Sequence, residues 1–113
     1  MALSELCFHL QERRGMYLPD GRYASAVAFV EGYNTALGGA SLRGFQQWLS
    51  KRVYGRDSGV HWSYIVASIR VNELRDGGMG FDRIPPDQDE ILINDLVELI
   101  AEFVTWSARG FDG

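Results

Sequence analysis

The segment 87–108 constrains the fold most, because its apolar residues recur at helical spacing around a wide arc. One line of the arc holds Leu92, Leu96, Leu99, Phe103 and Trp106, and the adjacent line holds Ile93, Val97, Ile100 and Val104. A surface helix needs only a single narrower apolar stripe. Pro85 and Pro86 would end any element that precedes them. Asp87, with Glu90 three residues later, matches a capping box. We therefore predict a helix over Asp87–Ala108 at the centre of the hydrophobic core.

Four earlier segments also show helical periodicity, and strand-like alternation is scarce. We expect these helices at about Ser4–Arg13, Arg22–Leu37, Leu42–Tyr54 and His61–Leu74. In the third of them, Gln47, Ser50 and Lys51 fall on the predicted polar face. A chain of 113 residues suits one domain. The predicted fold is all-α, a single domain over residues 1–113 with about five helices, in which 77–88 is a flexible connector before the last helix.

Composition excludes several classes of protein. One cysteine and two histidines support neither a disulfide framework nor a structural zinc site. No apolar run reaches the roughly 18 residues of a membrane span, and the first residues lack the basic start of a signal peptide. The basic residues are scattered rather than interleaved with aromatics, and the pI is about 5.0. We expect a cytoplasmic protein that binds neither nucleic acid nor a membrane.

A search for catalytic chemistry finds no constellation of nucleophile, base and charge-stabilising group. His61 has no partner nearby in the sequence, and Glu5 with His9 is an ordinary pair at helical spacing. The acidic run 87–90 lacks the glycine that a calcium loop needs at its sixth position. We therefore expect a non-enzymatic protein with no metal and no cofactor.

Negative charge is concentrated after Arg75. The chain carries a net charge of −4, although basic residues outnumber acidic ones up to that point. Helical spacing predicts that Asp95, Glu98 and Glu102 face solvent on the last helix. With Asp89, they are the residues we expect to bind a basic partner, while Asp87 and Glu90 cap the helix. An acidic face of this kind accelerates association with a cationic protein.

Two alternatives to a protein-binding face stay open at this stage. In the first, the chain is a small-molecule-binding protein or an enzyme, with an aromatic pocket around Tyr17, His61 and Trp62. In the second, the wide apolar arc of the last helix holds a structural homodimer together.

Three short motifs follow one another in the first half of the chain. They are Gly15-Met16-Tyr17, Phe29-x-x-Gly32-Tyr33 and Phe45-x-x-Trp48-Leu49. In this order they resemble a group of small bacterial proteins without an assigned activity. That resemblance implies an accessory or immunity-type protein. Combined with the acidic last helix, it leads to the hypothesis of an immunity or inhibitor protein that neutralises a toxin or effector.

Overall fold

A computed structural model describes residues 3–12, 20–36, 38–39, 42–71 and 84–109 of the protein. These residues form five helices and no strand. The helices are α1 (Leu3–Glu12), α3 (Tyr23–Ala36), α4 (Phe45–Tyr54), α5 (Trp62–Ser68) and α6 (Pro86–Ala108). The prediction of an all-α, single-domain bundle of about five helices is confirmed.

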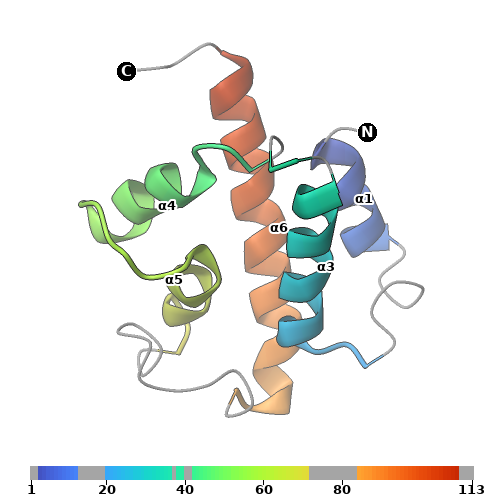
Figure 1. Ribbon diagram of the computed structural model, residues 1–113. Coiled ribbons are helices and arrows are strands. Elements are labelled where there is room, and N and C mark those ends of the chain that lie inside the picture. The colour runs from blue at the N-terminus through green and yellow to red at the C-terminus, as the bar shows by residue number, and fades with distance from the viewer. Residues whose placement is uncertain (1–2, 13–19, 37, 40–41, 72–83, 110–113) are drawn as a thin grey trace.

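The last helix, α6, lies at the centre of the bundle. Figure 1 shows α1 and α3 on one side of it and α4 and α5 on the other. Each of these four helices contacts α6. Seven of its apolar side chains are buried: Leu92, Ile93, Leu96, Val97, Leu99, Ile100 and Phe103. Because helices pack on both sides, the apolar arc has to be wide, and this chain covers it without a second copy. The width of the arc is therefore explained by packing within the chain.

Aromatic side chains fill the space between α4, α5 and α6. Phe45 is fully buried and meets Phe103 edge-on, with their ring centroids 5.3 Å apart. It also meets Trp62 edge-on at 5.8 Å and stacks against Trp48 at 6.1 Å. Edge-to-face pairs at these distances add to the stability gained from burying the rings. The aromatic positions of the sequence motifs in this region therefore form hydrophobic core.

The start of α4 differs from the prediction. The helix begins at Phe45 rather than Leu42, and Leu42 is buried in the turn that precedes it. Gly44 has a φ of +85°, a left-handed conformation that interrupts helical geometry just before Phe45. Gly55, with a φ of +75°, ends α4 as its N–H donates to the carbonyl of Lys51. The predicted end at Tyr54 is confirmed.

The predicted end of α5 and the predicted N-cap of α6 are wrong. The α-helix at α5 stops at Ser68, well before Leu74, which lies outside the described residues. α6 begins at Pro86, and its N-cap is Pro85 rather than Asp87. A proline fits the first helical position because its φ is already helical and no N–H is needed there. Asp87 lies in the first turn, where a carboxylate interacts favourably with the helix dipole.

The predicted flexible connector 77–88 is therefore too long. Pro86, Asp87 and Gln88 belong to α6, and Ile84 is buried in the core. Residues 77–83 lie outside the described residues. Within the described part of the chain, no helix combines the length and apolar character needed to cross a bilayer.

Candidate functional site

Asp89 does not lie on an exposed acidic face. It is only 4% exposed, and its Oδ2 atom forms an ion pair with Arg22 Nε at 2.8 Å. Its Oδ1 atom accepts the backbone N–H of Tyr23 at 2.8 Å. The carboxylate thus satisfies an N–H at the start of α3 that has no partner within the helix. Asp89 therefore does not belong to an exposed face, because its carboxylate is buried and joins α3 to α6.

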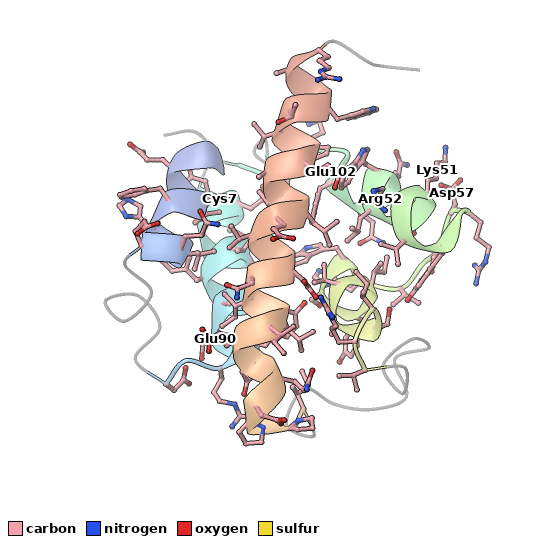
Figure 2. The ribbon with its side chains drawn as sticks, turned by 180° about the vertical axis from the view of Figure 1, so that it is seen from behind. Cys7, Lys51, Arg52, Asp57, Glu90 and Glu102 are labelled. Atoms are coloured by element: carbon pink, nitrogen blue, oxygen red, sulfur yellow. The ribbon has the colours of Figure 1, made fainter. Side chains whose placement is uncertain are left out.

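Asp95 and Glu102 form ion pairs with arginines from other parts of the chain. Arg70 donates from Nε to Asp95 at 2.9 Å, and Arg52 donates from Nε to Glu102 at 2.8 Å. Figure 2 shows Arg52 of α4 beside Glu102 of α6. The hydrogen bond with each carboxylate, reinforced by its charge, raises the pKa of Arg52 and of Arg70. These two acids therefore help to hold α4 and the end of α5 against α6.

The prediction that Asp95 faces solvent is wrong, since its side chain is 14% exposed. Glu102 is exposed as predicted, but its carboxylate is occupied by Arg52. Both side chains lie on the flank of α6 that faces the neighbouring helices. A carboxylate on this flank points toward the side chains of a neighbouring segment. In both cases the side chain that it meets is an arginine.

An exposed acidic stripe remains along the outer side of α6, which is turned toward the viewer in Figure 2. We use the name outer stripe for the exposed residues on this side of α6. They are Asp87, Glu90, Ile91, Asn94, Glu98, Ala101 and Thr105. In the part of the chain that the structure describes, Glu90 and Glu98 form no ion pair. Ile91 adds an apolar side chain that is 38% exposed. Of the four predicted partner-binding acids, only Glu98 lies on this stripe.

His61 and Trp62, two residues of the predicted aromatic pocket, belong to a hydrogen-bonded cluster between α3 and α5. Trp62 is buried, and its indole N–H donates to Glu31 Oε1 at 2.6 Å. His61 Nε2 lies 3.5 Å from the same oxygen. Tyr17 lies outside the described residues. Glu31 was not predicted from the sequence, because only the tertiary structure brings it to His61 and Trp62.

Ser63, His61 and Glu31 follow one another in the order of a catalytic triad, but a substrate cannot reach the serine. His61 Nδ1 is 2.7 Å from Ser63 Oγ, while its Nε2 faces Glu31. A nucleophilic serine must reach a substrate, and Ser63 is only 2% exposed. His61 Nδ1 also accepts the backbone N–H of Ser63, which makes His61 the N-cap of α5. The arrangement supports helix capping, with Glu31 orienting the histidine ring.

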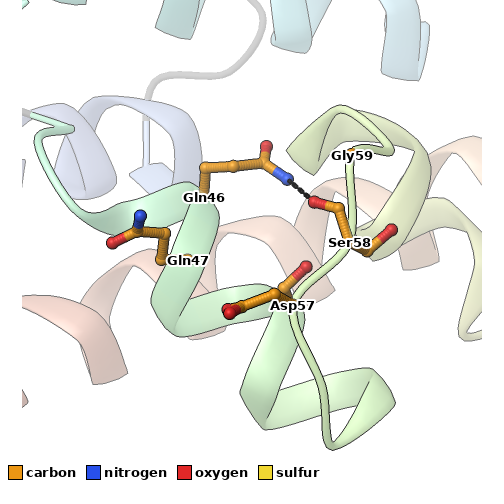
Figure 3. A pocket seen from close by; sticks show the side chains of 6 residues that line it. Gln46, Gln47, Asp57, Ser58 and Gly59 are labelled. Atoms are coloured by element: carbon orange, nitrogen blue, oxygen red, sulfur yellow. Dashed lines mark hydrogen bonds between the residues drawn. The ribbon is translucent and has the colours of Figure 1, made fainter.

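A polar hollow lies between α4 and the loop that follows it. It has a volume of about 440 Å³ and is wide open to solvent. Its lining consists of Gln46, Gln47, Ser50, Asp57, Ser58 and Gly59. Figure 3 shows Gln46 reaching across from α4 to the loop, where its side-chain amide donates to the carbonyl of Ser58 at 3.5 Å. The same amide donates to the carbonyl of Val60 at 2.5 Å, so the loop is fastened back onto α4.

Metal ligation finds no support in the described residues, where no three His, Cys, Asp or Glu side chains gather closely enough to share an ion.

The motifs behind the bacterial resemblance are partly covered by the described residues. Phe29, Tyr33 and Trp48 pack against the core, and Gly15-Met16-Tyr17 lies outside the described residues. The chain matches no family model, no curated protein and no solved structure.

Proposed function

We propose that this protein is a non-enzymatic protein-binding module whose outer stripe of α6 docks against a basic surface of another protein. The observation that carries the proposal is a difference between acids on one helix. Asp89, Asp95 and Glu102 have arginine partners, whereas Glu90 and Glu98 have no ion pair within the described residues. Carboxylates left exposed in a row attract a cationic partner from a distance and orient it during approach.

Rigidity and length also favour this face. α6 has 23 residues and so extends over about 35 Å, long enough for a standard protein interface. Its inner side is buried along most of its length, so binding does not have to order the helix first. Ile91 offers one apolar contact among the acids. These features suit a partner with basic side chains around a small apolar depression.

The finer part of the proposal is an immunity or inhibitor role, in which the partner is a basic toxin or effector. The resemblance to small bacterial proteins supports it, together with the acidic stripe. A cytoplasmic location belongs to the same proposal, and Cys7, a free thiol, is consistent with a reducing compartment.

The first experiment is an affinity capture from extract of the source cells, followed by purification of the captured protein. Association rates are then measured at two salt concentrations for three forms of this protein. The test variant is Glu90→Gln with Glu98→Gln, and the control is Ala28→Lys with Thr35→Lys on exposed positions of α3. Both variants raise the net charge by the same amount, so they separate the outer stripe from overall charge.

We expect the test variant to associate about tenfold more slowly at low salt and to lose most of its salt dependence. The control should stay close to the parent. Equal rates for both variants, or the absence of any captured protein, would overturn the proposal. Capture of a second copy of this chain alone would support the homodimer alternative instead.

A further inference from the structure

The polar hollow beside α4 has the composition of a binding site for a hydrophilic molecule. Every side chain that lines it is polar, and Gly59 contributes only backbone. Its volume of about 440 Å³ lies within the range of small-molecule sites. The hollow is formed by residues separate from the outer stripe of α6, so this inference does not depend on the proposed function.

Two parts of the hollow are held in place before any ligand arrives. The Gln46 amide nitrogen is committed to the carbonyls of Ser58 and Val60, which leaves its Oε1 atom as an acceptor. The Ser58 hydroxyl accepts the backbone N–H of Val60 at 3.1 Å. A loop fixed in this way does not have to be ordered on binding, which lowers the entropic cost of capturing a ligand.

Other groups of the hollow have unused hydrogen-bonding capacity. Gln47 is exposed and offers both a donor and an acceptor, and the Asp57 carboxylate, 75% exposed, accepts only. Ser50 also borders the hollow and is 1% exposed. Its hydroxyl has no hydrogen-bond partner among the residues that the structure describes. A buried hydroxyl in this state is costly to the fold, and it is closed to a ligand.

Charge decides the class of ligand. Among the described residues that line the hollow, Asp57 alone is charged, and Lys51 Nζ lies 4.0 Å from its carboxylate. Arg56 lies over the ring of Tyr54 and donates to the backbone carbonyl of Asp57. The surroundings thus balance the carboxylate and favour neither an anion nor a cation. Amides and a carboxylate together are suited to a molecule with several adjacent hydroxyl groups.

We propose that this hollow binds a small neutral polyhydroxylated molecule, up to the size of a monosaccharide. Adjacent hydroxyls would donate to Asp57 and to Gln46 Oε1, and would accept from Gln47. Aromatic rings are missing from the lining given by the described residues, so stacking adds nothing. For a ligand of this size held by hydrogen bonds alone, we expect a dissociation constant of about 1 mM.

The test is an NMR titration of the isotopically labelled full chain with myo-inositol. Saturable shifts are expected for the side-chain amides of Gln46 and Gln47 and for the backbone amide of Gly59. Two further probes identify the chemistry: tert-butanol has a single hydroxyl, and inorganic phosphate is anionic. Neither should produce saturable shifts at these positions.

Variants then assign the contacts. Gln47→Ala and Asp57→Asn should each weaken myo-inositol about fivefold, the effect of losing one hydrogen bond. Gln11→Ala, an exposed glutamine on α1, is the matched control and should leave the affinity unchanged. Shifts that stay linear in myo-inositol, equal shifts with tert-butanol, or saturation by phosphate alone would each overturn the proposal.

Discussion

Arg22 and Asp89 join the beginnings of two helices. Arg22 directly precedes α3, and its Nε atom lies 2.8 Å from Oδ2 of Asp89 in the first turn of α6. The other carboxylate oxygen accepts the N–H of Tyr23, whose own hydroxyl donates to the carbonyl of Ser63 at 2.6 Å. One buried acid on α6 thus positions the start of α3, and Tyr23 extends the connection to α5.

Removing this carboxylate should therefore destabilise the fold. We expect Asp89→Ala to lower the free energy of unfolding by about 2–4 kcal/mol. The Tyr23 N–H would lose its hydrogen-bond acceptor, and Arg22 would lose its ion-pair partner. Asp87→Ala, an exposed acid on the same turn, should change it by less than about 0.5 kcal/mol. Urea denaturation of both variants measures the difference. Equal stability of the two would show that the buried pair contributes nothing.

The aromatic contacts of Phe103 predict a second large effect. Its ring meets Phe45 at 5.3 Å and Trp48 at 5.6 Å, so truncation leaves a cavity at the junction of α4 and α6. Phe103→Ala should cost about 3–5 kcal/mol in thermal or chemical unfolding. Ile91→Ala on the outer stripe should cost far less, since that side chain is partly exposed. A small loss at Phe103 would mean that this junction is loosely packed.

Cys7 makes stability depend on pH in the alkaline range. Burial raises the pKa of its thiol from 9.0 to about 11. The unfolded chain therefore loses this proton at a lower pH than the folded chain, and the thiol's contribution declines as pH rises from 9 to about 11. The stability difference between the parent and Cys7→Ala should shrink by about 1–2 kcal/mol across this window. A stability difference that stays constant over this pH range would contradict the raised pKa of the Cys7 thiol.

The pair between Arg52 and Glu102 should contribute modestly, since both side chains are about half exposed. A double-mutant cycle with Arg52→Ala and Glu102→Ala should give a coupling energy of about 0.2–1 kcal/mol. High salt should reduce it, because exposed charges are screened. No measurable coupling at low salt would show that the two side chains move independently in solution.

Ser50 yields a prediction with the opposite sign. Because its buried hydroxyl has no hydrogen-bond partner within the described structure, Ser50→Ala should raise the free energy of unfolding by about 1 kcal/mol. Differential scanning calorimetry tests this directly. The same variant should leave myo-inositol binding unchanged, because the hydroxyl is closed to solvent. A loss of stability would reveal a partner for the hydroxyl.

Much of the fold was predictable from local patterns. The two apolar lines in 87–108 identified α6 and its central position, because helical periodicity records how apolar side chains are distributed around a helix axis. The predicted end of α4 at Tyr54 is also confirmed, because Gly55 follows it and adopts a left-handed conformation there. The end of α5 was harder to place, since a chain can leave helical geometry in response to tertiary packing without a proline or glycine at that point.

The candidate sites were decided by tertiary structure. Helical spacing placed Ser50 on a polar face, but the fold buries it beside the loop that follows α4. The same spacing placed Asp95 in solvent, whereas Arg70 from the end of α5 covers it. Periodicity within one helix specifies the angle at which a side chain leaves the axis. What stands at that angle comes from residues distant in the sequence, and only the packing of the elements brings them together.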